Sequence, residues 1–94
     1  MDVFAVKDKT NRNIYLSKER WVHIQKHPEC TLHFLERMKD TLVHPDTIQD
    51  FEFDPRVHFY YRRYADVRGY LFISVKYLNG KGFIITSFYT DKIT

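Results

Sequence analysis

The sequence predicts an α+β protein in which two helices cover one face of a twisted antiparallel sheet. Two segments in the first half of the chain have helical spacing of apolar residues, and alternating segments precede and follow them. The late alternating segments have no helical crossovers between them, which excludes a parallel doubly wound sheet. With 94 residues, 44% hydrophobic and 17% aromatic, the chain forms one domain, residues 1–94.

The first elements form a hairpin followed by a helix. Residues 3–7 and 13–16 are short strands joined by a polar loop. Ser17 is the expected N-cap of a helix over residues 18–27, which ends before Pro28 because the residue preceding proline avoids the α region.

A second helix begins after Thr31, another good N-cap residue, and His44-Pro45-Asp46 closes it. Its apolar positions fall at helical spacing: Leu32, Leu35, Met38 and Leu42. This helix completes the predicted helical layer.

Four strands follow as a meander, over residues 47–53, 57–64, 70–77 and 82–90. The turn Asn79-Gly80 is the strongest hairpin signal in the chain. The predicted order is therefore β-β-α-α-β-β-β-β.

Composition and charge narrow the function classes. A single cysteine, Cys30, excludes an internal disulfide framework, and we expect a cytoplasmic protein with neither a signal peptide nor a membrane span. The net charge is +3 and the pI about 9.0. Residues 36–54 are mainly acidic and residues 56–81 mainly basic, so a polyanionic partner is permitted but not required.

The first helix carries candidate acid–base residues. At about 100° per residue, Arg20, His23 and His27 fall together, opposite the apolar sector. Two imidazoles beside an arginine suit proton transfer around a phosphate, although surface helices also carry such residues without function. Cys30 could add a metal ligand, but the His-x-x-x-His frame lacks the metalloprotease glutamate, so we expect no metal.

The strand at 57–64 has two faces with different chemistry. One of these faces carries His58, Tyr60, Arg62 and Tyr64. Its rings could stack bases and its cations could hold phosphates, or these side chains could simply cover an outward face of the sheet.

The hairpin at Asn79-Gly80 predicts that Leu78 faces Lys81 and that Lys76 faces Phe83. Lys76 is a candidate fixed charge for a phosphate. A regular hairpin places Ser87 with Lys76, and a bulged one places Thr86 there, so either residue could supply a functional hydroxyl. In the regular register, the core face comprises Leu71, Ile73, Val75, Ile84, Thr86 and Phe88.

Several segments together resemble a known nuclease superfamily. They are residues 16–24 (LSKERWVHI) followed by His27-Pro28-Glu29, residues 43–48 (VHPDTI), the Tyr60-Tyr61-Arg62 run with 71–76 (LFISVK), and 82–91 (GFIITSFYTD). This set, over about residues 14–93, is similar to the BECR superfamily of barnase, EndoU, colicin and RelE-like nucleases, in its PBECR-like, phage-borne branch.

The resemblance implies a metal-independent ribonuclease without cofactors, in which the RNA 2′-hydroxyl attacks the adjacent phosphate. It implies roles in acid–base catalysis for His23 and His27, phosphate binding for Arg62 and Lys76, and a hydroxyl from Thr86. The expected substrate-binding residues are Tyr60, Tyr61, Arg20 and Tyr89. The family often has an aromatic hydroxyl two positions after that threonine, where this chain has Phe88 with Tyr89 next to it.

The implied partners are RNA and a cognate antitoxin protein, because members of this branch often act as toxins. The edge strand at 3–7 could also pair with a second copy of the chain. Two other interpretations stay open: a non-catalytic RNA- or ribosome-binding module, and a protein–protein interaction domain whose partner surface is the aromatic stripe.

Overall fold

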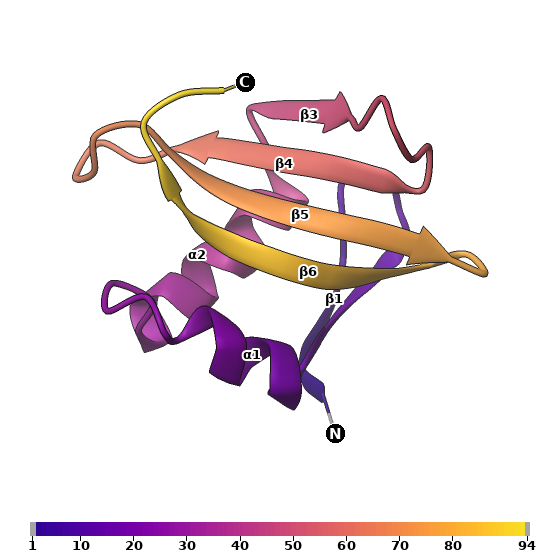
Figure 1. The fold of residues 1–94 in the computed structure, drawn as a ribbon, viewed down its shortest axis with the longest axis horizontal. Helices are drawn as coiled ribbons and strands as arrows, with labels where there is room; N and C mark the ends of the chain where they lie inside the picture. The colour runs from indigo at the N-terminus through magenta and orange to yellow at the C-terminus, as the bar shows by residue number, and fades with distance from the viewer. Residues whose placement is uncertain (1, 94) are drawn as a thin grey trace.

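The computed structural model describes residues 2–93 and confirms the α+β class, with two helices and six strands in that range (Figure 1). All six strands belong to one mixed sheet. The elements are β1 (Asp2–Lys7), β2 (Asn13–Ser17), α1 (Lys18–Ile24), α2 (Leu32–Val43), β3 (Thr47–Asp50), β4 (Val57–Arg63), β5 (Tyr70–Leu78) and β6 (Lys81–Thr90).

The sheet has the order β1-β2-β6-β5-β4-β3. Neighbouring strands are antiparallel except for β2 and β6, which pair in parallel at Ile14–Gly82 and Tyr15–Phe83. The sheet is therefore larger than the expected four-stranded antiparallel meander, because the N-terminal hairpin joins it. The apolar side chains of Ile14 and Leu16 are fully buried, which a detached hairpin could not achieve.

Helix α1 begins as predicted but ends early. The Arg20 backbone N–H donates to the Ser17 hydroxyl over 3.2 Å, which confirms the N-cap. The helix stops at Ile24 rather than at His27. The His27 N–H bonds to the Ile24 carbonyl, three residues back, because the chain tightens into a turn before Pro28. His27 therefore lies outside the helix.

Helix α2 buries most of the expected stripe. Met38 and Leu42 are buried and Leu35 is partly buried against the core, whereas Leu32 is 74% exposed and Phe34 is buried in addition. Thr31 occupies the N-cap position, but its side chain makes no capping hydrogen bond. Neither helix, in the part of the chain that the structure describes, is long and apolar enough to span a membrane.

The core fills the space between the helices and one face of the sheet. It includes the predicted Leu71, Ile73, Val75 and Ile84, all at most 2% exposed. In Figure 1, α2 passes behind the sheet and α1 lies below β6, so the face of β4, β5 and β6 opposite to α2 is turned toward the viewer. We call this uncovered side the open face.

A bulge in β6 decides which side chains reach the open face. The predicted pairs Leu78–Lys81 and Lys76–Phe83 are present. Val75 then pairs with Ile84 and Ser74 with Thr86, so Ile85 is an extra residue. The alternative with a bulge is thus the one found, although the bulge lies within the strand and not at the turn.

Candidate functional site

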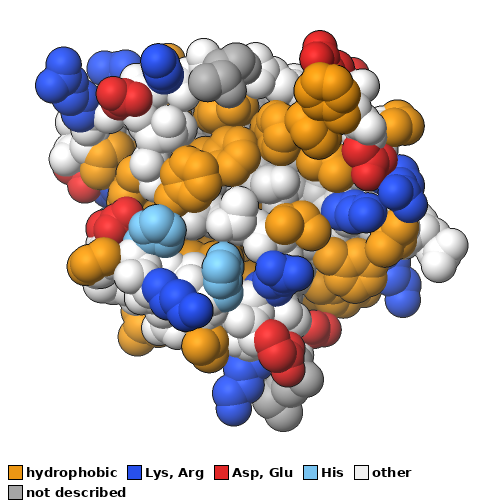
Figure 2. Space-filling model, in the orientation of Figure 1, with side chains coloured by type: hydrophobic (Ala, Val, Ile, Leu, Met, Phe, Trp, Pro, Cys, Tyr) orange, Lys and Arg blue, Asp and Glu red, His pale blue; other side chains and the backbone are white. Residues whose placement is uncertain are grey.

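Aromatic rings form a continuous array across the open face. Phe88 of β6 lies 4.9 Å from Phe72 of β5, which lies 5.4 Å from Phe59 of β4; Phe59 lies 5.3 Å from Phe51, all between ring centroids. We call these four residues the ring ladder. They are half-buried, so their rings are in contact with solvent. Figure 2 shows the corresponding hydrophobic band across this face.

Polar side chains lie beside the ladder on the same face. The bulge places Thr86 opposite Ser74, whereas Ser87 is fully buried and donates to the Phe72 carbonyl over 2.7 Å. Lys76, two residues beyond Ser74 on β5, shares this face, where such diagonal neighbours lie within reach of long side chains. Thr86, not Ser87, is therefore the hydroxyl that accompanies Lys76.

Lys76 is partly neutralised by one acid. Its Nζ lies 4.0 Å from Asp54 Oδ2, and Asp54 is also bound by the Arg56 guanidinium at 3.1 Å. The Arg56 hydrogen bonds hold the pKa of Asp54 below its usual value. Because Asp54 is shared with Arg56, it neutralises the Lys76 charge only in part, and Lys76 can still attract an anion on the open face.

His27 lies at the β6 end of the ladder. Its ring centroid is 6.1 Å from that of Phe88, and its Nδ1 is 4.0 Å from Glu29 Oε1. His23 and Arg20 are exposed on α1, within two turns before it. Figure 2 shows two histidine side chains next to each other below the hydrophobic band, with Lys or Arg side chains below and to the right of them.

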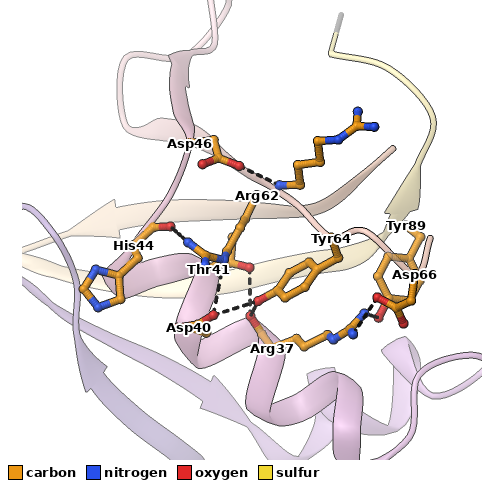
Figure 3. A network of polar contacts seen from close by, with 10 residues as sticks. Arg37, Asp40, Thr41, His44, Asp46, Arg62, Tyr64, Asp66 and Tyr89 are labelled. Atoms are coloured by element: carbon orange, nitrogen blue, oxygen red, sulfur yellow. Dashed lines mark hydrogen bonds and ion pairs between the residues drawn. The ribbon is translucent and has the colours of Figure 1, made fainter. Parts of the chain in front are cut away.

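Arg62 lies on the opposite side of the sheet, although we expected it at the phosphate. It pairs across from the buried Leu71, so its side chain is directed toward the helices. Its guanidinium donates to the His44 carbonyl over 2.6 Å, and its Nε lies 3.2 Å from Asp40 Oδ2 without hydrogen-bond geometry (Figure 3). Arg62 thus joins α2 to β4.

Tyr60 is also directed away from the open face. It is fully buried, and its hydroxyl contacts Asp8 and the Tyr77 hydroxyl. Burial, together with the hydrogen bond to Asp8, raises its pKa far above the usual range. Tyr60 is therefore a structural residue rather than a surface that RNA can stack on.

Tyr89 and Tyr61 point to different sides. Tyr89 packs edge-on against Phe34 of α2, and its hydroxyl accepts a hydrogen bond from Arg37 over 3.1 Å (Figure 3). Tyr61 is directed toward the open side of the sheet, 5.3 Å from Phe72 between ring centroids, but it is only 2% exposed and offers little surface to a base. The tyrosine next to Phe88 thus supports the helix layer and leaves Phe88 itself on the open face.

The side chains of β4 alternate between two faces as predicted, but the stripe that we expected at the surface faces the helices. His58, Tyr60, Arg62 and Tyr64 face the helical side, and Val57, Phe59, Tyr61 and Arg63 face outward. Polar partners from other segments satisfy the inward tyrosine and arginine. Phe51, Phe59 and Phe72 were not among the expected site residues; within β4, the parity opposite to the cationic stripe could have indicated Phe59.

A hollow lies at the His27 end of the open face. It has a volume of about 150 Å³ and is lined by Tyr61, Phe72, Phe88, Thr90 and Lys92. Three rings and one cation around so small a space suit a planar, unstacked group attached to an anion.

Among residues 2–93, no group of three or more His, Cys, Asp or Glu side chains could hold a metal ion. Cys30 is buried, and this burial, with the nearby Glu29 charge, raises the pKa of its thiol to about 12. The thiol is thus protonated near neutral pH and is a poor ligand.

The fold and the open face define a small α+β protein with a ring-lined, cationic sheet surface bordered by histidines. Comparison with protein-family models, curated proteins and solved structures finds no match. The proposals below therefore depend on the residues themselves and on the resemblance described above.

Proposed function

We propose that this chain is a metal-independent endoribonuclease that binds RNA on the open face and cleaves it beside His23 and His27. One observation carries the proposal. His27 lies against Phe88, so an imidazole stands at the end of a ring array that shares its face with Thr86 and Lys76. Rings that stack bases, a cation and imidazoles that exchange protons are the components that RNA cleavage needs.

The chemistry requires no external reactant. One imidazole accepts the proton of the 2′-hydroxyl as its oxygen attacks the adjacent phosphorus. The other imidazole donates a proton to the departing 5′-oxygen as the P–O bond breaks. The products are a 2′,3′-cyclic phosphate and a free 5′-hydroxyl. Arg20 would stabilise the additional negative charge, the Thr86 hydroxyl can donate to a phosphate oxygen, and Lys76, four residues along β5 from the Phe72–Phe88 pair, would hold a neighbouring phosphate of the strand.

Arg62 has no place in this arrangement, because its guanidinium is held by Asp40 and the His44 carbonyl on the helical side. Lys76 is the strand-borne cation that shares the open face with Thr86. We therefore assign the phosphate contact to Lys76 and a structural role to Arg62.

The wider biological role follows from the resemblance. We propose that the hairpin, helix pair and four-strand meander are the PBECR-like form of the BECR fold. A chain of this kind would act on cytoplasmic RNA as a toxin, and a cognate antitoxin protein would neutralise it. A basic open face is a suitable surface for such an inhibitor to cover.

A second candidate is an RNA-binding module that does not cleave. It is favoured by the engagement of Arg62, Tyr60 and Tyr89 inside the fold, which removes three of the expected RNA-binding side chains from the open face. In this case the open face would bind RNA, and the histidines could be replaced without effect.

The test compares cleavage of a labelled RNA by the unmodified protein with that by His23→Ala and His27→Ala. His33→Ala is the matched control, because His33 is an exposed histidine on α2. We expect each of the first two changes to slow cleavage about 10²- to 10⁴-fold, the usual contribution of a general acid or base. The control variant and added EDTA should leave the rate unchanged, and the ends should carry cyclic phosphate.

The outcomes separate the candidates. RNA that is bound in a salt-dependent manner but never cut would identify the binding module. Cleavage that survives both histidine changes would show that the catalytic assignment is wrong. Absence of both binding and cleavage would instead leave the open face as a protein-binding surface.

A further inference from the structure

We propose that the open face is a one-sided track for single-stranded RNA, with the scissile linkage at one end of the bound segment. This inference rests on the proposed function and specifies how its substrate lies. Nucleotides on one side of the linkage would stack along the ring ladder, and nucleotides on the other side would leave the protein at the α1 edge.

The spacing and tilt of the rings support a track. The ladder crosses from β6 through β5 and β4 to the segment after β3, with steps of 4.9, 5.4 and 5.3 Å between centroids. Adjacent rings are inclined by 37°, 50° and 46°, so none covers the full face of the next. Exposed ring faces accept bases of any sequence, and one base per ring gives a site of about four nucleotides.

The two ends of the track differ. At the β6 end, His27 stands beside Phe88, and α1 packs along this strand. At the other end, the Phe51 ring lies 5.4 Å from that of Phe53, which is 79% exposed, and the exposed Glu52 lies between the two in the chain. The Glu52 carboxylate repels the RNA backbone, so the track ends at this turn. The imidazoles are thus found at one end and not midway along the ladder.

Cations and a hollow accompany the track. Arg63 is exposed on the open side of β4, and Lys92 lines the 150 Å³ hollow with Tyr61, Phe72 and Phe88. The hollow adjoins the ring that His27 contacts. The base next to the scissile linkage would enter it and leave the stack, which brings its sugar to the histidine edge.

The experiment uses DNA oligonucleotides that contain a single ribonucleotide, so that only one linkage can be cleaved. Flanking deoxynucleotides are added one at a time, on the 5′ side in one series and on the 3′ side in the other. We expect kcat/KM to rise in only one series and to level off after about four nucleotides. The series that responds defines the polarity of the bound strand.

Phe59→Ala removes a central ring of the ladder. It should reduce kcat/KM for the longest substrate about 5- to 100-fold, the usual effect of losing one stacking contact, and leave the shortest substrate unchanged. Phe83→Ala is the matched control. Phe83 is a 40% exposed ring on the open face that stacks on Tyr15, outside the ladder. This variant should respond to length as the unmodified protein does.

Equal gains in both series, or cleavage that ignores length, would overturn the one-sided track. If no oligonucleotide is cut, the proposed cleavage fails, and the track is judged by fluorescence anisotropy with all-deoxy strands. Affinity that rises up to about four nucleotides, and is weaker in Phe59→Ala alone, would then support the track. Affinity independent of length or of Phe59 would refute it.

Discussion

The buried carboxylate of Asp8 offers the most direct test of how the N-terminal hairpin is held on the sheet. Asp8 is 5% exposed and lies in the loop between β1 and β2. Its Oδ1 accepts the backbone N–H groups of Thr10 and Arg12, both at 3.0 Å. Its Oδ2 accepts the hydroxyls of Tyr60 and, at 3.0 Å, Tyr77. One side chain thus joins the hairpin loop to β4 and β5.

Asp8→Asn should reduce the free energy of unfolding by about 2 kcal/mol. The amide oxygen can keep both backbone bonds, but the amide NH2 that replaces Oδ2 is a donor and cannot accept from the two tyrosine hydroxyls, so each of these bonds is lost at a cost of about 1 kcal/mol or more. Asp8→Ala removes every acceptor and should cost about 3–5 kcal/mol, as breaking a buried charged contact does. For a domain with a total stability of about 5–15 kcal/mol, the alanine variant approaches unfolding.

The loss of unfolding free energy caused by Asp8→Asn should also depend on pH. Burial raises the pKa of Asp8, but hydrogen bonds from Tyr60, Arg12, Thr10 and Tyr77 outweigh it and lower the pKa below the ordinary 3.8. A lowered pKa in the folded state stabilises the protein fully above pH 3.8 and progressively less as the pH falls through the folded value. The difference between the unmodified protein and Asp8→Asn should therefore shrink below about pH 4.

Urea unfolding at pH 7 and at several values below pH 4 measures both effects. Asp50→Asn is the control, because Asp50 contacts only His58, at 2.9 Å, and its side chain is 84% exposed; it should cost about 0.5 kcal/mol or less. An Asp8→Asn stability within about 0.5 kcal/mol of the unmodified protein at pH 7 would refute the reasoning. So would a difference that stays constant as the pH falls.

Two further predictions concern the packing of the core. Gly82→Ala should reduce the free energy of unfolding in urea by about 1–3 kcal/mol, because an added Cβ would collide with Ile14 and press on Val75 at 3.0 Å. Gly80→Ala should reduce it by about 1 kcal/mol, because no atom lies within 4 Å but the backbone φ is +79°. An equal cost for both would contradict the assignment of close packing at Gly82. Cys30, with its pKa raised to about 12, should resist a thiol reagent at pH 7 in the native protein and react in urea. Rapid modification of the native protein would show that the thiol is accessible.

Short-range sequence patterns were enough to predict the α+β fold class, the N-cap at Ser17 and the hairpin register at Lys76–Phe83. Each depends on residues near one another in the sequence, where capping and turn chemistry act directly. The attachment of β2 to β6 was not predicted. It joins Ile14 to Gly82, across most of the chain, and no short-range pattern encodes such a pairing.

The orientation of β4 shows why alternation alone misassigned the surface. Both parities of this strand carry large rings, so hydrophobicity does not tell which one faces the helices. The decision comes from distant acids. Asp8 satisfies the buried Tyr60 hydroxyl, and Asp40 of α2 lies 3.2 Å from the Arg62 guanidinium. With these partners, a tyrosine and an arginine can face inward, and Phe59 is left to the open face.

The candidate site depends on two local departures from regular structure. The bulge at Ile85 moves Thr86 and Phe88 to the open face and buries Ser87. The early end of α1 releases His27 from the helix, and the following turn leaves its ring 6.1 Å from that of Phe88. Without the bulge, Phe88 would face the helices, and His27 would lie beside no part of the ladder. A one-residue insertion and a shortened helix thus bring together groups that a regular strand and helix would keep on different sides of the sheet.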